Sequence, residues 1–248
     1  MYPACRHRLT LPCSPPQPGP TGPHMNRPVV ATRKPLTPFI AYLAFFYIAW
    51  SWIWVHIIYP WADHAIGPAT LSYALINIAF RTLIWVMPVF VYLRYIDRVP
   101  PIKYLQLTLN WKRGLLIGLV IAVIDFLGTL ARRGPPDWHA LYITWNSILS
   151  TSILIGVFEE IPFRGFIFQK LQKRLDFWSA NIISSLLFVG AHVPGWIMLH
   201  QFNAYNVIFI FMFGTIAAVL FRCTKSLRAS IVAHSLNNSI ANVIFHTY

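Results

Sequence analysis

The sequence predicts an all-α polytopic membrane protein, with about seven transmembrane helices, or eight if one long run is divided, around a polar intramembrane cavity. Of its 248 residues, 56% are hydrophobic and only 11% are charged, whereas a soluble domain carries about 25% charged residues. The apolar runs are about 17–23 residues long, which is enough to cross a hydrocarbon core of ~30 Å. The alternating pattern of a membrane β-barrel is absent.

The beginning of the chain differs in composition from the rest. Residues 1–38 are rich in proline, arginine and glycine and show no helical periodicity. Such a composition does not bury a core, so we expect a disordered, basic cytoplasmic arm. The transmembrane domain is then expected over residues 39–248, and the residues that suggest chemistry fall within 140–246.

The apolar runs and their flanking charges predict the topology. Lysine and arginine gather in alternate loops, which is the positive-inside pattern and places the N-terminus in the cytoplasm. Arg132 and Arg133 breach this pattern, because they follow a span on the predicted outer side. The expected spans are Phe39–Tyr59, Leu71–Leu93, Leu115–Ala131, Ala140 or Trp145 to Phe168, Ser179–His200, Tyr205–Phe221 and Ala229–Phe245.

The net charge of +13 raises the question of nucleic-acid binding. The positive residues cluster in loops between spans, and a basic rim of this kind suits anionic lipid. We therefore expect membrane lipids and no nucleic acid among the partners, and we predict an integral protein of the bacterial inner (plasma) membrane. The three cysteines have neither the spacing of a disulfide framework nor that of a metal cluster.

The only two glutamates of the chain, Glu159 and Glu160, are neighbours inside an apolar run. A charged side chain at that depth costs about 2.5–3.5 kcal/mol on insertion scales, which favours a functional role. The alternative is a structural pair at a wet helix end. Glu160 and Arg164 are four residues apart and share a helical face, whereas Glu159 points about 100° away, towards a water or a metal. Pro162 removes a backbone donor, so we expect a kink that opens the helix there.

Two later spans carry further polar residues. His192 follows Phe188 by four residues, and His234 and Asn238 share a face at the same spacing. Glu159 and the two histidines could bind a catalytic divalent metal with a position open for water. Without metal, the glutamate could act as a general base while the histidines and the asparagine orient water and stabilise an oxyanion. Alternatively, each histidine only makes a hydrogen bond between helices.

Arg81 and Asp125 also lie near the middle of predicted spans. The preferred interpretation is a structural ion pair between the second and third spans, because pairing offsets part of the cost of burying each charge. The alternative gives either residue a role in the site.

Taken together, these motifs resemble those of the CPBP family of intramembrane proteases, the Abi-type CAAX proteases and bacteriocin-processing enzymes. The family includes the type II CAAX prenyl endopeptidases. Its EExxxR motif corresponds to residues 159–164, its FxxxH motif to 188–192 and its HxxxN motif to 234–238. A smaller element, an aromatic residue three positions before a glycine, resembles residues 211–214. The resemblance covers about residues 140–246.

The resemblance implies an intramembrane endopeptidase with Glu159 as the base that activates water and His192 as its partner. His234 and Asn238 would stabilise the oxyanion, and Glu160 and Arg164 would support the first helix. The family also leaves metal dependence open: a single divalent ion, with zinc the expected one, would be held by Glu159, His192 and His234. The implied partner is a peptide or protein substrate, with or without a lipid modification; the sequence does not indicate an oligomeric state.

Two other functions remain open at this stage. A non-enzymatic membrane scaffold or immunity protein could keep the same fold. A proton-coupled transporter could use the buried charges as a relay, although the sequence lacks inverted repeats. For hydrolysis, Glu159 and the two histidines must meet in a cavity, which we expect to open to the cytoplasm. By residue counting His192 lies too deep, so we expect residues 176–181 to lie partly outside the membrane.

Overall fold

The computed structural model describes residues 35–139, 141 and 143–245, without the side chains of 61–64. Every regular element within these residues is helical, and they contain no β-strand. The predicted arm lies outside the described residues as far as residue 34. The all-α class is therefore confirmed for the part of the chain that the structure describes.

Five helices are long and apolar enough to cross a membrane. Each coincides with a predicted span to within a few residues at either end, so the protein is an integral membrane protein. The remaining two predicted spans, near 145–168 and 229–245, are helical but more polar or interrupted, and a total of seven or eight stays a prediction. The five helices are Thr37–Pro60, Leu71–Ile96, Trp111–Arg133, Phe177–Met198 and Ala204–Thr224.

Several long helices change between α and π geometry along their length. A π segment carries one more residue in each hydrogen-bonded turn and is frequent at functional sites. The elements are α1 (Thr37–Ile53), η1 (Trp54–Ile66), α2 (Leu71–Arg81), η2 (Thr82–Val86), α3 (Met87–Val91), η3 (Tyr92–Ile96), α4 (Pro101–Tyr104), α5 (Trp111–Arg133), η4 (Asn146–Ile153), α6 (Ile155–Glu160), η5 (Ile161–Phe168), α7 (Gln169–Gln172), α8 (Phe177–Met198), α9 (Ala204–Thr224), α10 (Leu227–Ser239) and η6 (Ile240–Ile244), where η marks π geometry.

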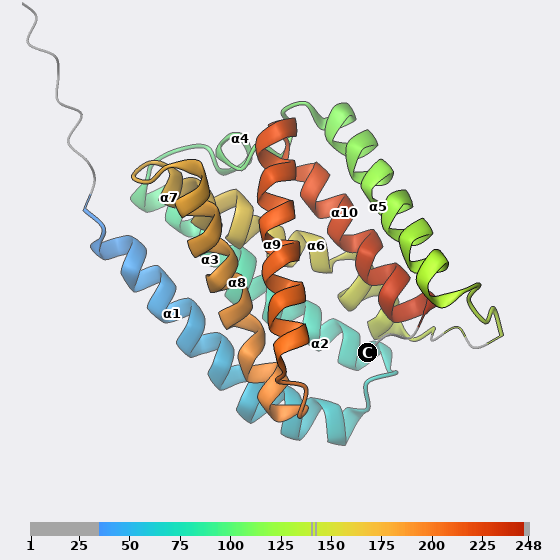
Figure 1. The fold of residues 1–248 in the computed structure, drawn as a ribbon. Helices are drawn as coiled ribbons and strands as arrows, with labels where there is room; N and C mark the ends of the chain where they lie inside the picture. Colours follow the sequence, from blue (N-terminus) through green and yellow to red (C-terminus); the bar gives the residue numbers. More distant parts are fainter. Residues whose placement is uncertain (1–34, 140, 142, 246–248) are drawn as a thin grey trace, which may run out of the picture. The chain divides into compact units, whose positions relative to one another are not determined.

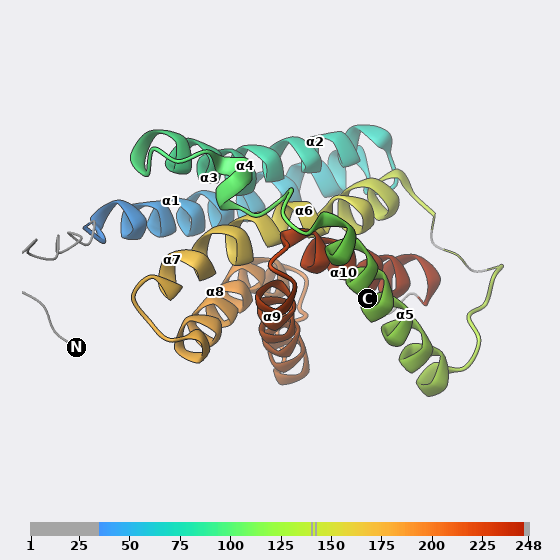
Figure 2. The same ribbon diagram turned by 90° about the horizontal axis from the view of Figure 1, so that it is seen from above.

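The helix that contains α6 lies in the middle of the bundle. Figure 1 shows α10 running between α5 and α9, with α8 next to α9. Figure 2 shows α1, α2 and α3 together on the other side of α6. The six-residue α6 therefore contacts elements of both groups, α10 on one side and η2 on the other.

Aromatic side chains fill the space between these two groups of helices. Trp85 packs edge-on against Trp50, Phe46 and Phe163, with ring centroids 4.9, 5.1 and 5.7 Å apart. All four are at most 4% exposed. The indole nitrogen of Trp50 donates to the carbonyl of Ala191 at 3.0 Å. Such edge-to-face pairs add about 0.5–1.5 kcal/mol each beyond burial. They hold η2 against α1 and η5, and the indole hydrogen bond joins α1 to α8.

Glycines allow α10 to approach its neighbours closely. A Cβ atom added at Gly156 of α6 would lie 2.3 Å from the carbonyl oxygen of Ile231. One added at Gly118 of α5 would lie 2.9 Å from the carbonyl oxygen of Ala229. Small residues at such contacts are the usual device for packing helices in membranes. The backbone of α10 is thereby fixed directly against α5 and α6.

A side-chain cap sets the start of α8. Asp176 has extended backbone angles and accepts hydrogen bonds from the backbone N–H groups of Trp178 and Ser179, at 2.9 and 3.1 Å. The hydroxyl of Ser179 also donates to it, at 2.6 Å. These bonds stabilise the ionised carboxylate and lower the pKa of Asp176. The helix thus begins at Phe177, close to the predicted Ser179.

Candidate active site

The two glutamates lie at the end of a short α segment between two π segments. Helix α6 ends at Glu160, and η5 begins at Ile161 with Pro162 as its second residue. Proline cannot donate a backbone hydrogen bond, so the regular α pattern cannot continue through it. The structure changes from α to π geometry at this point, whereas the predicted kink itself stays a prediction. This change fixes where the neighbouring carboxylates point.

Glu159 meets both motif histidines. Its Oε2 lies 3.7 Å from Nε2 of His192 and 3.6 Å from Nε2 of His234. These separations exceed hydrogen-bonding distance, and Oε2 has no hydrogen-bond partner although Glu159 is only 4% exposed. Residues from α6, α8 and α10 thus face a common point, as their motif positions predict. The carboxylate oxygen is available to a small molecule placed among them.

The other oxygen of Glu159 is paired with Arg81 of α2, whose Nη1 lies 3.1 Å from Oε1. The predicted Arg81–Asp125 ion pair is therefore wrong. Asp125 instead accepts a hydrogen bond from Nδ2 of Asn237 at 2.9 Å. The physical reason is packing: α2 lies against η4, whereas α5 lies against α10. A residue count gives the depth of each charge but not the side of the bundle that it faces.

Aromatic rings hold the Arg81 guanidinium in place. Its central carbon lies 5.4 Å from the centre of the Trp50 ring and 5.6 Å from that of Trp85. Arg81 is 9% exposed, so these cation–π contacts are largely desolvated and correspondingly stronger. Sequence reasoning gave Arg81 a site role only as the weaker alternative. A single arginine within an otherwise apolar span was the available indication that it pairs with an intramembrane carboxylate.

Glu160 links two helices through one oxygen. Its Oε1 accepts from Nη1 of Arg164 at 3.1 Å and from Nδ1 of His234 at 2.8 Å. Glu160 and Arg164 are 0% and 1% exposed, respectively. A carboxylate bonded to the second nitrogen of a histidine fixes the orientation of that ring. Glu160 is thus placed to hold His234 toward Glu159.

The aromatic-and-glycine element of α9 provides the space that Arg164 needs. A Cβ atom added at Gly214 would lie 3.1 Å from Nη2 of Arg164 and 3.1 Å from Oγ of Ser185. The guanidinium also lies 4.2 Å from the centre of the Phe188 ring. Phe213, next to Gly214, packs on His234 with ring centroids 4.6 Å apart. The element therefore supports the site by packing: Gly214 leaves room for Arg164, and Phe213 packs against His234.

Both histidines present Nε2 to the site. His192 has Nδ1 at 2.9 Å from the carbonyl oxygen of Phe188, and His234 has Nδ1 at 2.8 Å from Glu160. Since both partners only accept hydrogen bonds, each Nδ1 carries a proton; this assignment follows from the bonding pattern. In the neutral rings, each Nε2 is then an acceptor facing Oε2 of Glu159.

Asn238 contacts a different element. Its Nδ2 donates to the carbonyl of Thr151 at 3.2 Å, and Nδ2 of Asn242 donates to the same carbonyl at 3.3 Å. The two bonds tie the end of α10 and the following η6 to η4, directly before α6. Within the described residues, no hydrogen bond joins Asn238 to Glu159 or to the histidines. Its role at an oxyanion stays a prediction.

The residues predicted to hold a metal can be compared with known metal sites. Ligating histidines usually bond their second nitrogen to a carboxylate or carbonyl, as His192 and His234 do here. However, no three His, Cys, Asp or Glu side chains among the described residues are arranged to hold a metal ion. The Arg81 cation also engages one oxygen of Glu159. Metal dependence therefore stays a prediction.

Comparison with known proteins agrees with the motifs. A family model described as "Type II CAAX prenyl endopeptidase Rce1-like" matches residues 140–240. Searches among curated proteins and solved structures returned no match. The matched segment contains every motif residue described above, whereas Arg81 lies outside it. The resemblance carried by the motifs is confirmed: residues 140–240 are similar to the CAAX protease (CPBP) family.

Proposed function

We propose that this protein is an intramembrane endopeptidase that hydrolyses peptide bonds with water activated by Glu159. The family implies a protease. The observation that carries the mechanism is the unpaired Oε2 of Glu159, buried and faced by Nε2 of both His192 and His234. A general base needs this arrangement: an accepting oxygen, shielded from bulk water, beside groups that can position a water molecule.

The first step begins at Glu159. Its Oε2 takes a proton from a water molecule, while Nε2 of His192 accepts the hydrogen bond of the remaining O–H and orients the oxygen. That oxygen attacks the carbonyl carbon of the peptide, and the π electrons move onto the carbonyl oxygen. Arg81 keeps the other carboxylate oxygen fixed throughout. Because the base is already held in position, most of the translational and rotational freedom of the reacting groups is lost before the transition state.

The second step breaks the C–N bond. The oxyanion collapses, and the carboxylic acid of Glu159 returns its proton to the leaving amine nitrogen. While the oxyanion exists, it needs donors in a site closed to water. His234 has Glu160 at its Nδ1, and the side-chain amide of Asn238, which is a donor, lies one turn further along the same helix. We assign both to the oxyanion; the site residues alone supply these steps.

The substrate and location follow from the family and the charge pattern. The matching family is described as a CAAX prenyl endopeptidase. C-terminal CAAX-type processing of a lipidated peptide is therefore the first candidate reaction. The alternation of basic loops favours a cytoplasmic N-terminus, and we propose the bacterial inner membrane as the location. We propose that the site opens to the cytoplasm and takes a peptide or protein substrate from there.

The proposal is tested by comparing new peptide termini in host membranes that carry the wild type or Glu159→Gln at matched expression. The isosteric change keeps the shape and removes the basic oxygen. Asp137→Asn, at an exposed position outside the helices, is the matched control. Termini that appear with the wild type and the control but not with Glu159→Gln support a protease and identify its substrate. Identical profiles in all three would favour the scaffold function.

A further inference from the structure

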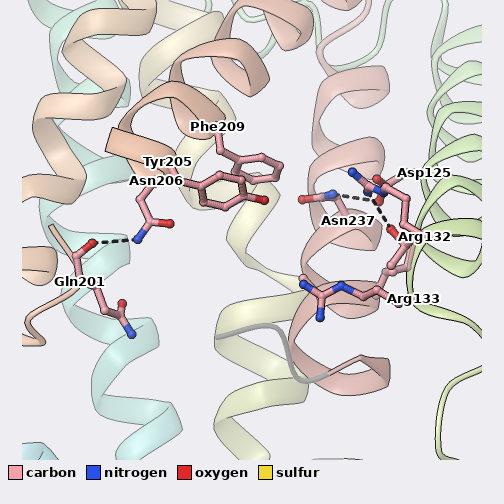
Figure 3. Close-up of a pocket in the computed structure, with 11 residues that line it drawn as sticks. Asp125, Arg132, Arg133, Gln201, Tyr205, Asn206, Phe209 and Asn237 are labelled. Atoms are coloured by element: carbon pink, nitrogen blue, oxygen red, sulfur yellow. Dashed lines mark hydrogen bonds between the residues drawn. The ribbon is translucent and has the colours of Figure 1, made fainter. Parts of the chain in front are cut away.

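A polar pocket of about 320 Å³ lies between α5, the beginning of α9 and the end of α10. Its walls include Arg132 and Arg133 of α5, Gln201 directly before α9, and Tyr205 and Asn206 of α9. Figure 3 shows Tyr205 and Asn206 across the pocket from the two arginines. The volume is at the lower end of the range for small-ligand sites. The described residues that line the pocket are distinct from those of the candidate active site, so it is a separate candidate site.

The pocket lies at the end of α5 opposite the basic loops. Helix α5 runs from Trp111 to Arg133 and is about 35 Å long at 1.5 Å per residue. It therefore reaches from one boundary of a hydrocarbon core of ~30 Å to the other. Figures 1 and 2 both show α5 and α9 diverging toward this end, and both helices pack against α10. The pocket between them is thus at the level of lipid headgroups on the predicted outer side.

The two helices that diverge here expose apolar side chains closer to the middle of the bilayer. On α5, Leu116 and Val120 are 63% and 48% exposed, and on α9, Met212 and Ile216 are 50% and 53% exposed. Phe209 of α9 continues this apolar surface into the pocket itself. A ligand at this place therefore meets polar groups at one end and hydrocarbon-facing side chains at the other. Amphipathic surroundings of this kind match a lipid molecule.

The Arg132 side chain turns toward the hydrocarbon. Its Nε donates to the carbonyl oxygen of Gly128 at 3.2 Å, and its Nη2 donates to the hydroxyl of Thr129 at 3.5 Å. These residues precede Arg132 by four and three positions, so the guanidinium lies about one turn deeper in the bilayer than its own Cα atom. An arginine near a helix end usually extends its charge toward the interface instead. Because both groups that it contacts are neutral, an anion in the pocket would complete its pairing.

The charges of the lining favour an anion beside the arginines. Arg132 and Arg133 bring two positive charges, and Asp125 brings one negative charge. Asp125 lies further from this end of α5 and already accepts a hydrogen bond from Nδ2 of Asn237 at 2.9 Å. Among the described residues, neither arginine forms an ion pair with a carboxylate. The two adjacent cations therefore lack a counter-ion at the place where lipid phosphates lie.

We propose that Arg132 and Arg133 bind the phosphate of an anionic phospholipid, whose acyl chains run along the exposed apolar surfaces of α5 and α9. Guanidinium groups bind phosphate oxygens through paired, charge-assisted hydrogen bonds. The side-chain amide of Gln201 and the phenol of Tyr205 carry donors suited to the ester oxygens of the lipid. A soluble phosphate would pair the arginines but leave the apolar surfaces uncovered. The inference uses no active-site residue and does not depend on the proposed function.

The experiment measures the lipid selectivity of the purified full chain. Native mass spectrometry counts the lipids retained from an equimolar mixture of phosphatidylglycerol and phosphatidylcholine with identical acyl chains. The wild type should retain phosphatidylglycerol at least about tenfold in preference, because one charge-assisted hydrogen bond is enough for that ratio. Arg132→Gln with Arg133→Gln should remove most of the preference. The thermal midpoint without added lipid shows which variants remain folded.

Matched variants separate the pocket from overall charge. Lys112→Gln with Arg113→Gln makes the same change of charge at the opposite end of α5, where both residues are exposed, and should keep the preference. Arg132→Lys with Arg133→Lys should keep part of it, since lysine binds phosphate as a point charge without paired bonds. Arg133→Gln alone, at an exposed position, should give a smaller loss and serves if the double glutamine variant does not fold.

Four results would overturn the inference. The first two are equal retention of both lipids by the wild type and a preference that survives in the folded glutamine variants. The third is an equal loss in the two double glutamine variants, because that is the effect of overall charge. The fourth concerns glycerol 3-phosphate, which carries the phosphate without acyl chains and should not displace phosphatidylglycerol. Displacement by it would indicate a site for a soluble phosphate.

Discussion

Nη1 of Arg81 lies 3.1 Å from Oε1 of Glu159, so a helix outside the family match completes the candidate site. The pair is buried, at 11% and 5% side-chain exposure. It leaves Oε2 as the only carboxylate oxygen of Glu159 that faces the histidines. Arg81 is thus a positioning residue: it acts on the reaction through the orientation of the base.

Replacing Arg81 should lower turnover more than substrate binding. Arg81→Gln leaves Glu159 without its cation, and breaking one partner of a buried pair costs about 3–5 kcal/mol. We expect a lower thermal midpoint and a fall in kcat of at least about tenfold with little change in KM. Kinetics on the cleaved peptide, read as kcat and KM separately, check this.

Arg81→Lys is the informative comparison. Lysine retains the charge but not the planar fork that stacks on Trp50 and Trp85, so part of the lost turnover should return. An unchanged kcat in Arg81→Gln protein that remains folded would show that Glu159 does not depend on this contact.

Adding one methyl group at Gly156 should destabilise the bundle. The new Cβ would meet the Ile231 carbonyl oxygen at 2.3 Å, and backbone cannot move aside as a flexible side chain can. Overpacking of this kind costs about 1–3 kcal/mol, so Gly156→Ala should unfold at a lower temperature. Gly128→Ala is the matched control, because nothing lies within 4 Å of its new Cβ. Similar melting temperatures for the two variants would contradict the tight α6–α10 contact.

The cap of α8 should give a pH-dependent stability. Because hydrogen bonds depress the pKa of Asp176, its contribution is fully present above the unfolded-state pKa of about 3.9 and is lost as pH falls through the folded-state pKa. Melting curves of the wild type and Asp176→Ala should therefore differ at pH 7, begin to converge below about pH 4, and meet only below the lowered folded-state pKa. Asp176→Asn keeps a capping oxygen that does not titrate. A difference from Asp176→Ala that persists at low pH would argue against the cap.

Removal of metal ions tests the residue-only mechanism. The proposed steps need no ion, so purified protein should retain its kcat after treatment with a strong chelator and dialysis. Activity that disappears and returns on addition of Zn²⁺ would assign Glu159, His192 and His234 to a metal after all. Elemental analysis of the purified protein provides an independent measurement.

Much of the fold and the grouping of the motif residues could be predicted from the sequence. Membrane helices must satisfy their backbone internally, so apolar run lengths predict the spans directly. Glu159, His192 and His234 could be grouped because each is an intramembrane polar residue within a recognisable motif. Hydrocarbon gives polar side chains few partners other than one another.

The partner of Arg81 could not be predicted in the same way. Counting residues gives the depth of a side chain, but its direction around the helix axis depends on which helices pack together. Arg81 and Asp125 have similar depths and different neighbours, Glu159 and Asn237. The π segments on either side of α6 also rotate side chains away from the directions that a uniform α-helix would give.

The Arg81–Glu159 pair has a consequence for biosynthesis. The two residues are 78 positions apart, and ribosomes add about 5–20 residues per second. Arg81 is therefore synthesised about 4–16 s before Glu159, and during that interval it has no counter-ion. The second span must enter the bilayer by the strength of its own apolar residues, and a chain truncated before Glu159 should insert it equally well. The glutamate enters a membrane that already holds the charge it will pair with.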